Sequence, residues 1–105
     1  MPTREIAGVT VEVTPDGYLL NLDQWTEDMA PVLAQEEGIA HLTDGHWKVI
    51  RFLQSDFKES GAIPTIRRVK NAGGIPTKDL YALFPKGPLK KATRIAGLMK
   101  PSSCV

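Results

Sequence analysis

The chain has 105 residues, of which 42% are hydrophobic and 24% are charged, and its formal net charge is +1. This length suits one domain with a modest core, and the composition excludes a disordered chain. No apolar run approaches the roughly 20 residues of a membrane span, and the N-terminus lacks the pattern of a signal peptide, so we expect a cytoplasmic protein.

The first segment is predicted to form a β-hairpin. The sequence EIAGVTVEV alternates in polarity and is rich in β-branched residues, and TPDG supplies a turn with proline and glycine in favoured places. The stretch YLLN would then return antiparallel, with an earlier turn at Ala7-Gly8 as an alternative. A hairpin this small is stable only when helices pack against it.

Two helices are predicted next. Thr26 before two acidic residues indicates the N-cap of a helix that stops at Gly38, although Pro31 allows a later start. Thr43 indicates the cap of a second helix, in which apolar residues recur every three or four positions. This second helix is predicted to end near Gly61.

Three shorter helices complete the prediction. PTIRRVKNA and PTKDLYALF, the second with Thr77 as a cap, are joined by a pair of glycines, which is the outline of a helix-turn-helix. GPLKKATRIAGL predicts a last helix from about Pro88 to Ala96. The following residues 98–105, LMKPSSCV, contain a proline and small polar residues and are predicted to be a mobile arm.

The predicted fold class is therefore mainly α (α+β). Residues 1–105 are expected to form a single domain, a compact helical bundle with an N-terminal β-hairpin, a helix-turn-helix-like portion and a flexible C-terminal arm. We find no repeat, no low-complexity tract and no linker that would divide the chain.

Cys104 is the only cysteine, so the chain cannot form an internal disulfide or a zinc cluster of cysteines. An accessible thiolate is a strong nucleophile. The arm beyond Gly97 spans up to ~26 Å when fully extended, at ~3.3 Å per residue, which is enough to enter a cleft in another protein. The alternative is an incidental cysteine at a frayed terminus.

The small net charge conceals two regions of opposite sign. Residues 1–66 hold four basic and eleven acidic side chains, a net of −7, whereas residues 67–105 hold nine basic and one acidic side chain, a net of +8. The basic region predicts an acidic partner surface or a nucleic acid, and the alternative is that the two regions neutralise each other within the fold. The candidate partner-binding residues are Arg67, Lys86, Lys90, Lys91, Arg94 and Lys100.

Other kinds of site have little support in the sequence. The second helix of the helix-turn-helix outline offers only Lys78 and Asp79 near its start to contact base edges, so direct nucleic-acid binding is not expected. His41 and His46 lack further ligands at a suitable spacing, and neither NAGG nor PKGP fits a phosphate-binding loop. We therefore expect no metal and no cofactor.

The C-terminal sequence LFPKGPLKKATRIAGLMKPSSCV resembles the DsrC/TusE family of small sulfur-carrier proteins, whose pattern is LFPxGPxxxAxxxAGxPKPxxCV. DGYLLNLDQW, HWKVIRFLQSDF and PTIRRV are also similar to segments of that family and occur in the same order. The resemblance therefore covers nearly the whole chain.

The resemblance implies a compact helical fold with a mobile C-terminal arm. It also implies that Cys104 accepts sulfur as a persulfide and delivers it to a partner. The implied donor is a complex of the TusBCD or DsrEFH type, and the implied acceptor is a thiouridylase or another sulfur enzyme. The process would be 2-thiouridine formation in tRNA or dissimilatory or oxidative sulfur metabolism.

Departures from the family pattern bear on whether the chain resembles TusE or a dissimilatory member of the family. Dissimilatory members have a second cysteine eleven positions before the last one, where this chain has Thr93, and a threonine there resembles TusE. Met99 replaces an expected proline, Ser102-Ser103 differs from the common Thr-Gly, and NAGGIPTKDLY is shorter than the matching TusE segment. A DsrC-like paralogue is the alternative to a TusE.

Two further hypotheses belong to other functional classes. One is a regulator that senses sulfur through Cys104 and binds DNA or protein through the helix-turn-helix-like portion. The other is a non-catalytic subunit of a sulfur-enzyme complex, in which Cys104 would be dispensable.

Overall fold

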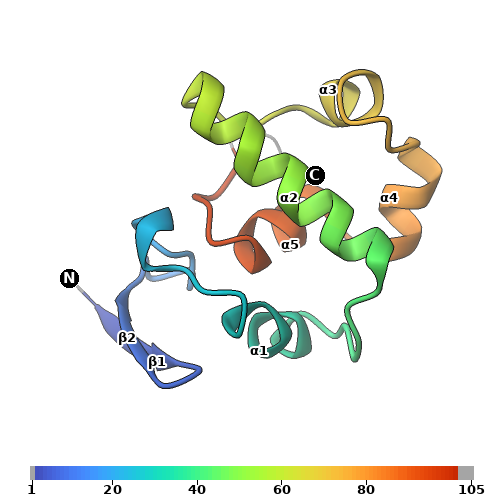
Figure 1. The fold of residues 1–105 in the computed structure, drawn as a ribbon. Coiled ribbons are helices and arrows are strands. Elements are labelled where there is room, and N and C mark those ends of the chain that lie inside the picture. The colour runs from blue at the N-terminus through green and yellow to red at the C-terminus, as the bar shows by residue number, and fades with distance from the viewer. Residues whose placement is uncertain (1, 102–105) are drawn as a thin grey trace.

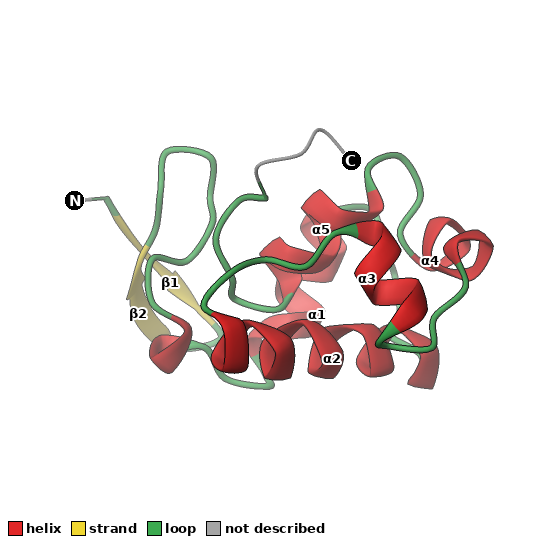
Figure 2. Ribbon diagram, turned by 90° about the horizontal axis from the view of Figure 1, so that it is seen from above, coloured by secondary structure: helices red, strands yellow, loops and turns green. Residues whose placement is uncertain are grey.

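The computed structural model describes residues 2–101, and most of them are helical. Figure 1 shows α2 crossing the molecule, and Figure 2 shows the β-hairpin at one end with α3 and α4 towards the other. The predicted class of a helical bundle with an N-terminal hairpin is confirmed. The elements are β1 (Thr3–Ile6), β2 (Val9–Glu12), the 3-10 helix η1 (Leu22–Gln24), α1 (Met29–Glu36), α2 (Asp44–Ser60), α3 (Ile66–Asn71), α4 (Thr77–Leu83) and α5 (Pro88–Ile95).

The hairpin turns at Ala7-Gly8, which the sequence offered only as the alternative. β1 and β2 pair antiparallel, with Thr3 opposite Glu12 and Ile6 opposite Val9. The φ angles of Ala7 and Gly8 are +51° and +83°, and two residues with positive φ make the tight turn that suits the twist of a hairpin. The return from TPDG, predicted as the main pairing, forms only a single bridge between Val13 and Leu19.

Two predicted helix starts are wrong by a few residues. The first helix begins at Met29, and its cap Asp28 lies two residues after the predicted cap Thr26. Pro31 then lies in the first turn, where its missing N–H leaves no hydrogen bond unmade. Pro76, and not Thr77, is the cap of α4. The predicted cap Thr43 and the predicted stop at Gly61 of α2 are confirmed.

The core forms where α1, α2 and α5 meet. α5 contacts both α1 and α2, and the amphipathic pattern of α2 buries Val49, Ile50 and Leu53 completely. Side chains from the hairpin and from α3 and α4 join the same cluster. The hairpin therefore gains its stability from the helices, because two strands alone bury too little apolar surface.

The chain after α5 remains packed against the body over its first residues. Gly97 has a φ of +78°, and the amide of Leu98 donates to the Thr93 carbonyl at 2.9 Å. Leu98 is 2% exposed and Pro101 is buried. The arm predicted over residues 98–105 thus starts with residues that belong to the folded body, while its last four residues lie outside the described range.

Replacing Gly97 by alanine should destabilise the protein severely. A Cβ there would lie 2.5 Å from Cδ1 and 2.6 Å from Cγ of Trp25, in addition to the cost of positive φ. We expect a loss of about 3 kcal/mol in unfolding free energy, from overpacking and left-handed strain together. Urea denaturation monitored by circular dichroism measures this loss of unfolding free energy.

Gly61→Ala is the matched control. Gly61 has a similar φ of +75°, but a Cβ there would meet nothing within 4 Å. Strain alone should cost about 1 kcal/mol. Equal losses for the two variants would contradict the proposed contact with Trp25.

Candidate functional site

The predicted nucleophile Cys104 lies outside the described residues, so the site is built here from the surface that precedes it. α5 leads into Gly97 and Leu98, and the described chain ends at Pro101. Two residues, Ser102 and Ser103, separate Pro101 from Cys104. The packing of α5 and of residues 97–101 therefore decides from which point of the molecule the thiol is presented.

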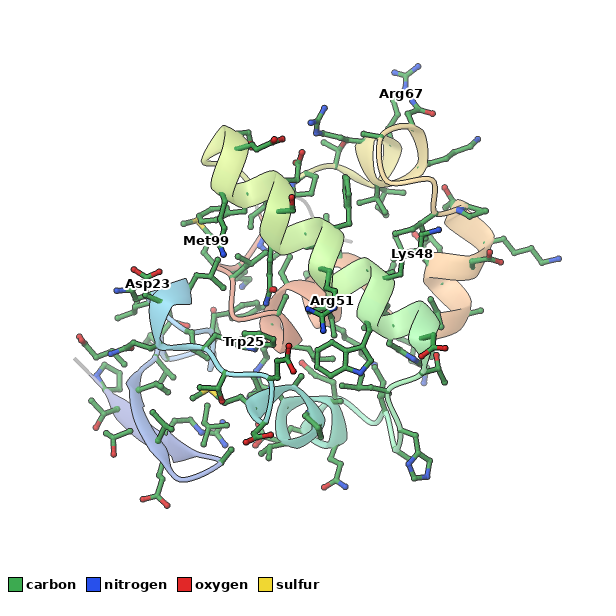
Figure 3. All side chains as sticks on the ribbon, in the orientation of Figure 1. Asp23, Trp25, Lys48, Arg51, Arg67 and Met99 are labelled. Atoms are coloured by element: carbon green, nitrogen blue, oxygen red, sulfur yellow. The ribbon has the colours of Figure 1, made fainter. Side chains whose placement is uncertain are left out.

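Side chains from distant parts of the chain fix the C-terminal end of α5. The indole Nε1 of Trp25 donates to the Ile95 carbonyl at 2.8 Å, and Nε2 of Gln54 donates to the Ala96 carbonyl at 2.8 Å. These two acceptors lie among the last carbonyls of the helix, which have no partner within it. Figure 3 shows Trp25 beside the end of α5. The point from which the tail starts is thereby held by α5 itself, by Gln54 of α2 and by Trp25, which follows η1.

Thr93 is fully buried within α5. Its Oγ1 lies 2.8 Å from the Leu89 carbonyl oxygen and 3.1 Å from the Lys90 carbonyl oxygen. The hydroxyl can donate a hydrogen bond to either of them. Such a bond back to the preceding turn satisfies the hydroxyl without a partner from elsewhere. Position 93, where the resemblance implies a second cysteine in dissimilatory members, thus holds a core residue with satisfied hydrogen bonds.

Arg94, one of the six predicted partner-binding cations, is largely enclosed. Its side chain is 11% exposed and contacts Glu36 at 2.6 Å and Glu37 at 3.7 Å, and its Nε donates to the Gly17 carbonyl at 3.2 Å. These contacts join α5 to α1 and to the turn after β2. Arg94 therefore supports the fold, and little of its charge faces a partner.

The other five cations divide into two groups. Lys91 donates to the Glu37 carbonyl at 3.1 Å, and Lys100 pairs with Asp16 at 3.3 Å, so both contact the acidic region of the chain. Within the described residues, the side chains of Arg67, Lys86 and Lys90 make no hydrogen bond or ion pair. Figure 3 shows Arg67 pointing away from the body at α3. Neutralisation within the fold thus applies to Arg94, Lys91 and Lys100, and binding of a partner by the other three cations stays a prediction.

Glu36 is the anion that joins the hairpin to the helices. Arg4 donates to both of its carboxylate oxygens, at 3.0 and 2.6 Å, and Arg94 approaches from the other side. The pKa of Glu36 is lowered to about 2, chiefly by the hydrogen bond from Arg4 and then by that from Arg94, against an opposing effect of burial. The carboxylate is therefore charged at all moderate pH values.

A groove of about 400 Å³ opens beside the start of the tail. Three segments form it: the chain around η1, the C-terminal end of α2, and the residues that follow α5. Figure 3 shows Met99 and Asp23, which both line the groove, on neighbouring segments. The lining residues are Leu19, Leu20, Asn21, Leu22, Asp23, Phe57, Lys58, Gly61, Gly97, Leu98 and Met99.

The sequence analysis did not find this groove. In the sequence, Phe57 is one of the periodic apolar residues of the second predicted helix, and Met99 is a departure from the family pattern. The one available signal was a pair of large apolar residues, Leu20 and Met99, next to polar neighbours in segments predicted as a strand end and an arm. Nothing in the sequence shows that these segments meet.

The two histidines differ in their surroundings. His46 is buried and edge-on to Phe84, its Nδ1 accepts from the Thr43 amide at 3.0 Å, and its Nε2 donates to the Leu83 carbonyl at 2.8 Å. Nδ1 thus completes the N-terminal cap of α2 and Nε2 joins α2 to the end of α4, whereas His41 is exposed. Between residues 2 and 101, no group of three metal-ligating side chains occurs.

Comparison with known proteins identifies the family. A family model described as "DsrC like protein" matches residues 5–105, which is almost the entire chain. The chain belongs to the DsrC-like family. The resemblance drawn from the C-terminal motif is thereby confirmed, and the matched range includes Cys104.

Relatives within the DsrC-like family carry two kinds of name. "Sulfurtransferase TusE" of Pectobacterium atrosepticum is 44% identical over 108 residues, covering 96% of this chain and 98% of the relative. "Sulfite reductase, dissimilatory-type subunit gamma" of Nitratidesulfovibrio vulgaris is 40% identical over 98 residues, covering 93% of each.

A solved DsrC-like structure agrees with the fold described above. The NMR structure of DsrC from Allochromatium vinosum has a TM-score of 0.84 and is 39% identical, covering 98% of this chain and 97% of that one. The arrangement of the helices and of the hairpin is therefore that of the family.

Acid should destabilise the protein in part through Glu36. Its pKa is lowered in the folded state, so its contribution is complete above its ordinary pKa of 4.5 and is lost as the pH falls towards 2. Glu36→Gln should therefore lower the melting temperature at about pH 6 and show a smaller further loss between about pH 6 and pH 3 than the wild type.

Glu5→Gln serves as the control, because Glu5 is exposed on β1 and makes no ion pair with a described residue. Its melting temperature should follow the wild-type pH dependence. An unchanged pH dependence in Glu36→Gln would show that the pair of arginines does not hold this carboxylate.

Proposed function

We propose that this protein is a sulfur carrier that accepts sulfane sulfur as a persulfide on Cys104 and passes it to a partner protein. The observation that carries the proposal is the family match, which runs through the C-terminal motif to residue 105 and includes the only cysteine. The names of the relatives, a sulfurtransferase and a sulfite reductase subunit, both belong to sulfur metabolism.

The transfer is a thiol-persulfide exchange. The Cys104 thiolate attacks the outer sulfur of a donor persulfide, a new S–S bond forms at Cys104, and the donor's S–S bond breaks. The electron pair of the broken bond stays with the donor sulfur, which leaves as a thiolate. Since one S–S bond replaces another, no external oxidant or reductant is required, and delivery to the acceptor repeats the same exchange.

The chain's own contribution is to present the thiol. Activation of the thiol is assigned to the active sites of the donor and acceptor proteins. Packing of Leu98 and Pro101 places the tail at one defined point of the surface. The exposed cations Arg67 and Lys86, with the partly buried Lys90, raise the rate of association with an acidic rim on the partner.

The absence of a second cysteine restricts the redox chemistry of this chain. With Thr93 buried and Cys104 the only thiol, no disulfide can form within the chain. We therefore favour a relay of the TusE type, in which a TusBCD-like complex donates sulfur and a thiouridylase accepts it. A DsrEFH-like donor with a sulfur-oxidising acceptor is the second candidate, favoured by the 40% identity to a sulfite reductase subunit.

The cytoplasm is the compartment in which such a relay would operate. No helix between residues 2 and 101 is long and apolar enough to cross a membrane. A free thiol also persists best in a reducing environment. Neither the described residues nor the named relatives support the alternative of a regulator that binds DNA.

Loading of Cys104 is the direct test. After incubation with glutathione persulfide, intact-mass analysis of the wild type should show one added sulfur atom, and Cys104→Ser should show none, because serine cannot form a persulfide. The addition should disappear on treatment with a reducing thiol. A wild type that takes up no sulfur, or a Cys104→Ser variant that retains full activity in a reconstituted relay, would favour a non-catalytic subunit.

Charge reversal at Arg67 tests electrostatic guidance. Arg67→Glu should slow sulfur transfer from a protein donor several-fold at low ionic strength, and the difference should vanish at about 1 M salt, where charges are screened over ~3 Å. Lys48→Glu, an exposed cation of α2 outside the basic C-terminal region, is the control. An equal effect of both substitutions would show that only net charge matters.

A further inference from the structure

Two exposed apolar side chains meet at the groove beside the tail. Leu20 is 42% exposed and Met99 is 51% exposed, and both line this groove. The other large apolar side chains that are this exposed within residues 2–101 are Val9 on the hairpin and Tyr81 on α4. Half of this small set thus lies at one place, next to the residues that lead to Cys104.

The groove is apolar at its floor and mixed at its edge. Leu19 and Leu98, at 1% and 2% exposure, form the floor, and the partly buried Leu22 and Phe57 extend it. Asp23 and Lys58 supply one charge of each sign to the lining. An apolar floor with a mixed edge fits a protein–protein interface, which has an apolar core and a more polar rim.

The short connection to Cys104 determines what covers this groove. Cys104 is three positions after Pro101, so at ~3.3 Å per residue it stays within ~10 Å of Pro101. A standard interface buries ~800 Å² on each partner, which corresponds to a patch of ~16 Å radius. A protein whose active site engages Cys104 therefore covers the surface around Leu98 and Met99 as well.

We infer that the groove seats an apolar side chain of the sulfur-exchanging partner protein, next to the entrance of its cysteine-containing active site. This inference rests on the proposed carrier function and names the surface that both partners use. Since the tether is short, donor and acceptor must bind the same face in turn. Met99 suits a surface that binds two different proteins, because its unbranched thioether side chain adapts to differently shaped partners.

Charge substitutions at the edge of the groove test the inference. Leu20→Glu and Met99→Glu place a carboxylate where the partner's apolar side chain would pack, and half-exposed positions tolerate the change in the free protein. The probe is a persulfidated donor complex of the TusBCD type. We expect each variant to lower the second-order rate of transfer at least about tenfold, as for a central interface residue.

Two comparisons isolate the docking step. Loading of the same variants by glutathione persulfide should stay within about twofold of the wild type, because a small donor needs no docking surface. Val9→Glu, with 39% exposure on the hairpin, should transfer from the protein donor at the wild-type rate. Unchanged melting temperatures of all three variants would show that folding is not the cause.

Several outcomes would overturn the inference and leave the carrier function standing. These are wild-type transfer rates from the protein donor in Leu20→Glu and Met99→Glu, an equal loss in Val9→Glu, or loading of the wild type by glutathione persulfide only. Faster loading of the two variants by glutathione persulfide would instead assign the groove to the chain's own tail. A wild-type dimer in sedimentation that Leu20→Glu abolishes would assign it to a second copy. Failure of the wild type to load from either donor would contradict the carrier function itself.

Discussion

The hydrogen bonds at the C-terminal end of α5 are the constraint on which the proposed function depends. A helix leaves its last carbonyls without partners, and here Trp25 and Gln54 donate to those of Ile95 and Ala96. Gly97 then turns the chain with a φ of +78° directly against the Trp25 ring, where no side chain would fit. Trp25 follows η1 and Gln54 belongs to α2. The point at which the tail leaves the body is therefore fixed by the folded core and not by the tail.

A fixed origin followed by a short connection suits a carrier better than a long free arm does. A tether of three residues beyond Pro101 lets the thiol search only a small volume, which raises its effective concentration at a docked active site. The same short reach requires the partner to contact the body around the tail. The groove with Leu20 and Met99 at its edge lies in that contact area, so presentation of the thiol and recognition of the partner are properties of one surface.

The division of charge along the chain serves two purposes. Arg94 and Arg4 both pair with Glu36 and thereby connect α5, the hairpin and α1. Their positive charge is used within the fold. Arg68 and Asp56 form a further pair at 2.6 Å between α3 and α2. Arg67 and Lys86 remain exposed, and the proposed function uses them to attract an acidic partner. A count of charges could not separate these groups, because the separation depends on which anions the fold brings near.

The sequence by itself determined the features that depend on neighbouring residues or on a long shared motif. The cap at Thr43, the glycine stop at Gly61, the class of fold and the family follow from local backbone preferences and from the pattern that ends in Cys104-Val105. Helix starts near prolines were misplaced, because a proline is compatible with several positions in a first turn. Only the tertiary structure decided that Arg94 contacts Glu36 across 58 positions of sequence, that Trp25 packs on Gly97, and that Leu20 and Met99 line one groove. Such contacts arise from packing between distant segments, whose partners no periodicity or spacing within one segment can specify.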